Sequence, residues 1–306
     1  GDVYKRQNHN LTMIPFYVFY SMFGFQRIHD LAWAAGDAQA KGFLIGATSG
    51  RTTLNGEGLQ HQDGHSHILS STIPNCKSYD PAYGYELAVI IENGLSEMYK
   101  DKKNYFYYLT VTNERYVQPP KPKGKDIDSN IIKGMHRISK TKKPHIRLLG
   151  SGAILNESIK AAEILSGFAI ESEVWSVTSF NMLRKDGMEV ENENIKNPSN
   201  KAKESFVAES FKEHDIPTVA STDYMRAYSE QIRPYMNSSY YTLGTDGFGR
   251  SDSRAKLREF FEVDAKSIVM TSAYALHKED KLNNKELQKI YKEIKVNKDK
   301  IAPWNT

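Results

Sequence analysis

The chain has 306 residues, of which 39% are hydrophobic, 25% charged and 11% aromatic. This is the composition of a globular protein, and it excludes global disorder and collagen-like or low-complexity repeats. The formal net charge is only +4, so the sequence does not indicate a nucleic-acid-binding protein. The single cysteine, Cys76, allows no internal disulfide and fits a cytoplasmic protein. The longest apolar run, residues 13–25, is too short to cross a bilayer, so we expect no membrane segment.

The first seven residues (GDVYKRQ) show no helix or strand signal and no signal-peptide pattern. Residues 2–7 resemble the in-frame translation of a transposon-type sequencing adapter, so we predict that segment 1–7 is not native. Residues 11–16 already read as a buried segment. We therefore expect this chain to be the C-terminal part of a longer protein.

The first half of the chain alternates between two hydrophobic periods. Stretches rich in β-branched and aromatic residues predict strands, and apolar residues three or four apart predict helices. We expect buried strands over 13–20, 41–48 and 105–112, helices over 26–39 and 83–99, and a Gly- and His-rich loop over 50–67. This alternation indicates an α/β domain with a parallel sheet and helices on both faces.

Residues 118–147 interrupt this pattern. They contain PPKPKGKD, in which prolines and a glycine break regular structure, and lysine and arginine far outnumber aspartate. We predict a basic, solvated linker there and a boundary between one domain over 8–124 and a second over 125–306.

The second half alternates in the same way and predicts a second parallel-sheet α/β domain. Asn156 can cap a helix over 157–166, which Gly167 would end. Further expected elements are strands over 145–149, 174–178, 218–220 and 267–272 and a helix over 284–296.

Two glycine-rich segments could bind ligands. Gly150-Ser-Gly152 lies between a strand and a helix, as in a dinucleotide-binding fingerprint, but position 155 is leucine, and a tight turn explains the glycines equally well. Residues 244–254 could bind an anion through free amides and Arg250, or form an ordinary structured loop.

The histidines of the 50–67 loop are the main chemical candidates. His61, His65 and His67 could bind a metal ion or be structural, but Gly64 interrupts any helix that would align the first two. We favour acid–base chemistry by His61, because imidazole titrates near neutral pH. Glu57 lies four residues earlier and could orient the imidazole.

Tyr20 and Phe23 lie at the end of the first predicted strand, three residues apart. In parallel α/β folds, ligands collect at the carboxyl ends of strands. The two rings could therefore stack on a flat heterocycle, although core packing is the default for an aromatic pair.

Several long motifs resemble one known family. FYSMFGFQRIHDLAWAAGDAQAKGFLIGATSGRTTLNGEGLQHQDGHSHI, IPNCKSYDPAYGYE, LLGSGAIL, STDYMRAYSEQIR and TDGFGRSDSR are similar to the homodimeric first component of the bacterial pyruvate dehydrogenase complex. The resemblance covers about residues 11–275. It implies two consecutive α/β domains of a transketolase-like thiamin diphosphate enzyme, namely the rest of the pyrimidine-binding domain and the C-terminal domain.

The resemblance also implies roles for four residues. Tyr20 and Phe23 match aromatic residues that line the aminopyrimidine pocket of thiamin diphosphate, and Glu57 and His61 match residues near the thiazolium ring and substrate. The implied reaction is decarboxylation of pyruvate and reductive acetylation of the lipoyl group of the dihydrolipoyl acetyltransferase component. We expect His61 to donate a proton to, or stabilise, the substrate-derived oxygen.

Parts of the family pattern are missing. The Gly-Asp-Gly motif that binds Mg²⁺ and diphosphate does not occur, and the glutamate that activates the aminopyrimidine precedes this segment. We therefore expect the isolated chain to be inactive, to expose apolar surface where the missing domain and second subunit pack, and to aggregate. The alternatives are another 2-oxo acid dehydrogenase, a transketolase relative, or a non-catalytic module that docks on an acyltransferase core.

Overall fold

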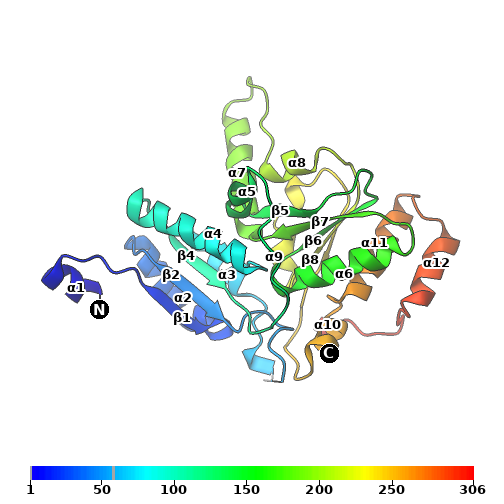
Figure 1. The fold of residues 1–306 in the computed structure, drawn as a ribbon, viewed down its shortest axis with the longest axis horizontal. Coiled ribbons are helices and arrows are strands. Elements are labelled where there is room, and N and C mark those ends of the chain that lie inside the picture. The colour runs from blue at the N-terminus through cyan, green and yellow to red at the C-terminus, as the bar shows by residue number, and fades with distance from the viewer. Residues whose placement is uncertain (1, 57–58) are drawn as a thin grey trace.

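The computed structural model describes residues 2–56 and 59–306 and contains two sheets (Figure 1). The first has the order β1-β2-β4-β3 and is parallel throughout. The second has the order β5-β7-β6-β8-β9, and only β5 runs antiparallel to its neighbour. The strands are β1 Phe16–Tyr20, β2 Phe43–Ala47, β3 Cys76–Tyr79, β4 Phe106–Thr110, β5 Met135–Ser139, β6 Ile146–Gly150, β7 Ser172–Val177, β8 Thr218–Ser221 and β9 Tyr240–Leu243. The α/β class predicted from the sequence is confirmed.

Helices connect the strands and cover both faces of each sheet. The α-helices are α1 Asp2–His9, α2 Ser21–Asp37, α3 Ser66–Ser71, α4 Gly84–Leu95, α5 Ile127–Lys133, α6 Leu155–Ser166, α7 Phe180–Lys196, α8 Phe206–Phe211, α9 Arg226–Glu230, α10 Arg254–Phe261, α11 Ala265–Lys278 and α12 Asn284–Glu293. Side chains cap several of them: Ser179 accepts a hydrogen bond from the backbone N–H of Met182 at the start of α7. None of the helices in the described part of the chain is long and apolar enough to span a membrane.

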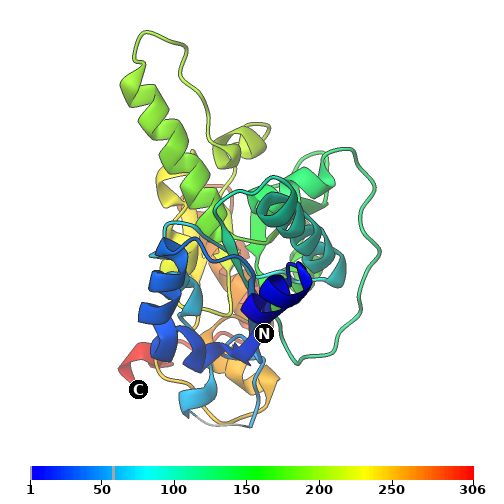
Figure 2. The same ribbon diagram turned by 90° about the vertical axis from the view of Figure 1, so that its left-hand side faces the viewer.

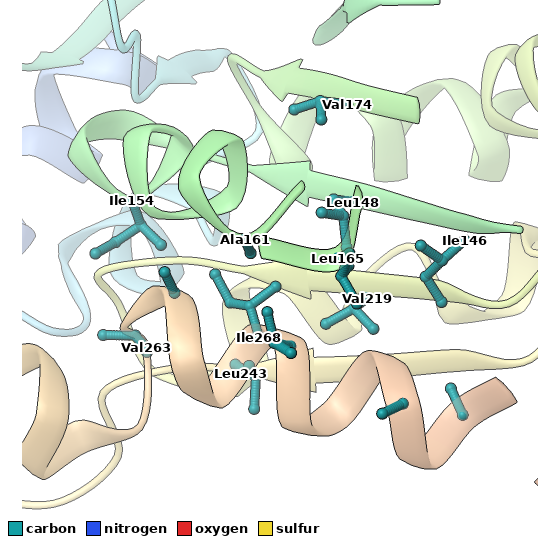
Figure 3. Close-up of a cluster of buried hydrophobic side chains, with 14 of the residues drawn as sticks. Ile146, Leu148, Ile154, Ala161, Leu165, Val174, Val219, Leu243, Val263 and Ile268 are labelled. Atoms are coloured by element: carbon teal, nitrogen blue, oxygen red, sulfur yellow. The ribbon is translucent and has the colours of Figure 1, made fainter. Parts of the chain in front are cut away.

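The core of the second sheet forms because successive strand residues point to opposite faces. Ile146 and Leu148 of β6 pack under α6 and α11, in the cluster drawn in Figure 3, whereas Leu149 faces α7 and α9. The first sheet is covered in the same way, by α4 and α5 on one face and by α2 and α3 on the other.

The two sheets lie side by side, with α7 projecting beyond them (Figures 1 and 2). Buried hydrogen bonds join them. The backbone N–H of Asp80, after β3, donates to the carbonyl of Thr178, after β7 (2.7 Å). Glu86 of α4 accepts from His136 Nε2 of β5 (2.7 Å) and from Ser176 Oγ of β7 (2.6 Å). The carboxyl ends of both sheets therefore meet at one interface.

The structure corrects several expectations about elements. Residues 267–272 belong to helix α11 rather than to a strand. The predicted linker, 118–147, is irregular only in its first part and then forms α5, β5 and the start of β6. Helix α6 begins after Ile154, so Asn156 lies inside it and does not cap it, although Gly167 ends it as predicted.

Two further differences concern the N-terminal region. Residues 2–7 lie in helix α1, where the sequence shows no helix signal. Strand β1 was predicted to be buried, but Tyr17 and Val18 are 59% and 61% exposed. The reason is that β1 is at the edge of its sheet and, among the described strands, pairs with β2 alone. Whether segment 1–7 is native stays a prediction.

Candidate functional site

Tyr20, Phe23 and His61 come together at the carboxyl end of β1. Tyr20 ends the strand and Phe23 lies in the first turn of α2. The Phe23 ring is 5.7 Å from that of Tyr20 and 5.3 Å from the imidazole of His61, with an edge-to-face angle of 87° to the imidazole. The Tyr20 and His61 rings are 5.9 Å apart. All three side chains are half-buried, so the cluster is packed but still accessible from solvent.

The loop that carries His61 is tied to the C-terminal part of the chain. Gln62 is fully buried, and its Nε2 donates to the carbonyls of Leu54 and Arg250, both at 2.7 Å. Its Oε1 accepts from the backbone N–H of Arg250 at 2.8 Å. Arg254 Nε donates to the carbonyl of Thr53, and the Gly56 N–H donates to that of Asp252. The position of His61 therefore depends on residues 250–254.

The other two histidines of the loop have different surroundings. His67 is fully buried, stacks on Tyr228 at 4.8 Å and pairs through Nε2 with the hydroxyl of Thr110. Burial lowers its pKa to about 3, so this imidazole is neutral and structural. His65 contacts Gln26, and burial also lowers its pKa.

Asp63 has a structural task. Its carboxylate accepts hydrogen bonds from the backbone N–H groups of His65 and Ser66 and from the Ser66 hydroxyl, at the start of α3. Among the described residues no group of three His, Cys, Asp or Glu could hold a metal ion. Glu57 lies outside the described residues, so its predicted role beside His61 stays a prediction.

Sequence reasoning missed a cavity where the carboxyl ends of the two sheets meet. The cavity has a volume of about 10 Å³, and two buried carboxylates line it: Asp80, directly after β3, and Asp223, two residues after β8. Burial raises the pKa of Asp80 to about 7 and that of Asp223 to about 6. The Thr110 hydroxyl opposes the shift of Asp80, and the positive charge of Arg258 and the Thr52 hydroxyl oppose that of Asp223. The sequence signal was limited to Asp223, which lies shortly after the strand predicted over 218–220.

The two glycine-rich segments have structural contacts that account for their sequences. Gly152 has φ +49°, and a Cβ there would lie 2.5 Å from Asp80 Oδ2. Its N–H donates to the carbonyl of Asp80. Close approach between the sheets thus explains this glycine without a dinucleotide. Within 244–254, the backbone of Arg250 pairs with Gln62 and its guanidinium donates to the Thr306 hydroxyl, which favours the structured-loop interpretation.

Comparisons with known proteins match both halves of the chain. Residues 3–119 match the family described as the pyruvate dehydrogenase E1 component middle domain, and residues 134–264 match the transketolase-like C-terminal domain. Pyruvate dehydrogenase E1 components of Pseudomonas aeruginosa and Escherichia coli K12 are 59% and 51% identical over 88% and 96% of this chain. The chain spans about a third of the length of these relatives, 31% and 33%.

Solved structures share the fold at low sequence identity. A transketolase from Leishmania mexicana matches 87% of this chain and 34% of its own with a TM-score of 0.66 and 14% identity. A split gene transketolase, described as an inactive beta4 tetramer, matches 88% of this chain and 78% of its own with a TM-score of 0.64 and 13% identity. On the strength of the two family matches and the sequence identities, the chain belongs to the pyruvate dehydrogenase E1 component family and carries its middle and transketolase-like C-terminal domains.

Proposed function

We propose that this chain is part of a thiamin diphosphate-dependent pyruvate dehydrogenase (acetyl-transferring) component, and that it supplies one wall of the cofactor site. The observation that carries this proposal is the cluster of Tyr20, Phe23 and His61 at the end of β1. Its residue types and its place at a strand end fit a flat heterocycle with a proton-transfer group beside it.

The residues present fit the ring of the cofactor. Tyr20 and Phe23 offer half-buried aromatic surface, and Arg27 covers part of Phe23 with its guanidinium 4.3 Å from the ring centroid. When bound, thiamin diphosphate supplies the electron sink that lets a 2-oxo acid lose carbon dioxide. The two aromatic residues orient the ring, and their apolar surface keeps water away from it.

His61 holds or donates the proton in this proposal. Its imidazole packs against both aromatic rings, so its orientation relative to the cofactor pocket is limited. An imidazole can exchange a proton near neutral pH, which suits a group that stabilises the oxygen of bound pyruvate. We propose that Glu57 holds the neighbouring hydrogen-bond network.

We propose that the rest of the site lies outside this chain. The Gly-Asp-Gly motif of the family does not occur in the sequence, so the ligands of Mg²⁺ and diphosphate would come from the remaining two thirds of the enzyme. We place the boundary between the two domains near residue 124. The isolated chain would then be catalytically inactive.

The proposed assembly is a cytoplasmic homodimer that passes its two-carbon unit to the dihydrolipoyl acetyltransferase component. Support for a missing neighbour comes from β1 and α2, where Tyr17, Val18, Leu31 and Trp33 are all at least half exposed. An apolar hollow of about 250 Å³ lies between α2 and the strands β1 and β2. Such a surface is typical of one that packs against another domain or subunit.

A chimeric enzyme tests the proposed function. Residues 8–306 of this chain replace the matching part of the Pseudomonas aeruginosa E1 component, which is 59% identical. We expect the chimera to decarboxylate pyruvate and to acetylate a lipoyl domain. His61→Ala should lower kcat about 100-fold or more, the usual effect of removing a group that transfers a proton.

The matched control is His145→Ala, because His145 is exposed and lies in the other sheet's domain. Binding of thiamin diphosphate, followed by calorimetry, separates loss of the cofactor from loss of chemistry. A folded, cofactor-binding chimera without activity towards pyruvate would overturn the proposed substrate. Wild-type turnover of the His61→Ala chimera would overturn the role of the histidine.

A further inference from the structure

In the cavity between the two sheets, the negative charge of Asp223 is partly balanced by Arg258, whereas that of Asp80 is not. Asp80 is 4% exposed, and its Oδ2 receives no hydrogen bond from any described residue. A buried carboxylate oxygen without a donor is unfavourable unless a proton, a water molecule or a cation compensates it.

The protein groups around Asp80 do not supply a positive charge. His67 Nε2 pairs with Thr110 Oγ1 (2.9 Å), and the Thr110 hydroxyl donates to Asp80 Oδ1 (2.7 Å). The Thr110 hydroxyl therefore donates its proton to Asp80 Oδ1 and not to Oδ2. His67, on the other side of Thr110, is neutral. The charged groups that act on Asp80 most strongly are Asp223 and Asp63, which are both negative.

The remaining wall of the cavity offers neutral oxygen atoms. Ser49, Thr53, Thr110 and Thr112 line it together with the two carboxylates. Gly50 has φ +83°, and a Cβ there would lie 2.2 Å from Asp223 Oδ2 and 2.8 Å from Thr53 Oγ1. Gly152 lies against Asp80 Oδ2 in the same way, because a Cβ there would also be too close to the carboxylate. The absence of a side chain at both glycines leaves space beside the carboxylate oxygens.

We propose that this cavity binds one monovalent cation, such as Na⁺ or K⁺, held by Asp80, Asp223 and the surrounding hydroxyls. The volume of about 10 Å³ admits one particle of the size of a water molecule. Hard cations take oxygen ligands, and a singly charged ion can be held by one or two carboxylates and neutral oxygens. Because its ligands come from both sheets, the ion joins the two halves of the chain. The proposal is independent of the chemistry proposed for His61.

Thermal unfolding of the chain in different salts tests the proposal. The midpoint is compared in sodium, potassium and choline chloride at equal concentration, about 0.15 M, and at about pH 8.5, where Asp80 is ionised. We expect the unfolding midpoint to be about 2–4 °C higher in sodium or potassium chloride than in choline chloride, and this rise to saturate with salt concentration. The reason is that the ion binds only the folded state. Asp80→Asn should abolish the rise.

Asp264→Asn is the matched control, because Asp264 caps α11 and does not line the cavity, and asparagine can also cap a helix. It should keep the full ion-dependent rise. Equal midpoints in all three salts would overturn the proposal and leave a proton or a water molecule in the cavity. So would an unchanged rise in Asp80→Asn.

Two measurements need no variant. The rise should shrink for the unchanged chain at about pH 5.5, because protons compete with the cation for Asp80; a rise independent of pH would contradict the site. In crystals grown with rubidium chloride, we expect an anomalous peak beside Asp80 Oδ2. Peaks found only elsewhere would overturn the assignment.

Discussion

Gln62 is one of the residues through which the C-terminal part of the chain positions His61. Gln62→Ala would leave the carbonyl of Leu54 and both backbone groups of Arg250 without their partner. Unsatisfied buried groups cost about 1–3 kcal/mol each. With three such groups, we expect a loss of at least about 3 kcal/mol in the free energy of unfolding and faster amide hydrogen exchange over 59–65.

Gln60→Ala is the control for this prediction, because Gln60 is exposed in the same loop. Exchange over 59–65 is measured by mass spectrometry in both variants, with β6 as the internal reference. Equal protection of the loop in Gln62→Ala and in the unchanged chain would show that other contacts position His61.

The pKa of Asp80 predicts how stability depends on pH when no small cation is present. Its folded-state pKa is about 7, above the ordinary value of 3.8, so the folded state holds this proton more tightly. The stabilisation is complete below about pH 4 and is lost as the pH rises through about 7. We expect the unfolding free energy of the unchanged chain, relative to Asp80→Asn, to fall by up to about 4 kcal/mol over that range.

Urea unfolding in choline chloride from about pH 4 to about pH 8 measures this difference. Asparagine does not titrate, so subtracting its curve removes the contribution of other groups such as His67. Parallel curves for the two proteins would mean that Asp80 titrates alike in the folded and unfolded chains.

The sequence identified some residues of the site much better than others. Tyr20, Phe23 and His61 were found through long motifs, and the structure brings them together. Gln62 and Asp80 lie in the same motifs but were not singled out, because their importance depends on partners more than 60 residues away. Only tertiary structure shows that such polar residues are buried and paired.

At the scale of elements, β1 exposes a strand edge and an apolar face. Val18 is 61% exposed, and within the described part of the chain β1 pairs with β2 alone. Such an edge promotes association, and a lysine on it opposes association. We expect the unchanged chain to self-associate and Val18→Lys to raise its dissociation constant at least about tenfold.

Sedimentation velocity over a range of protein concentrations measures this effect. Val117→Lys adds the same charge at a valine that is 86% exposed and lies outside the sheets. If both variants associate equally, net charge rather than the β1 edge controls association.

Two helices with a long apolar period were predicted correctly, whereas one short apolar stretch led to a wrong assignment. Helices α4 and α12 repeat apolar residues over three turns, and both are confirmed. Residues 267–272 look like a strand because they contain Ile268, Val269 and Thr271. In the longer helix α11, however, Ile268 and Val269 share a buried face with residues one and two turns later, and Asp264 caps the helix. The helical spacing of apolar residues becomes visible only over the full length of α11. A window of six residues is too short to show it.

At the scale of the whole molecule, the buried contacts of Glu86 predict that the two sheets unfold together. Glu86 is fully buried in α4 and accepts hydrogen bonds from the backbone N–H groups of Ala82 and Tyr83 as well as from His136 and Ser176 of the second sheet. Four donors converge on one carboxylate. Glu86→Gln would place an amide N–H group opposite these donors. We therefore expect the free energy of unfolding to fall by about 3 kcal/mol.

Calorimetry distinguishes this coupling from independent domains. We expect one unfolding transition in the unchanged chain, and one transition at a lower midpoint in Glu86→Gln. Glu92→Gln on the same helix is exposed and should leave the midpoint unchanged. Two transitions in the unchanged chain, with only one of them shifted by Glu86→Gln, would mean that the interface is too weak to couple the sheets. A single transition would mean that the loop carrying His61 and residues 250–254 unfold together. The proposed cofactor site requires this, because residues 250–254 position His61.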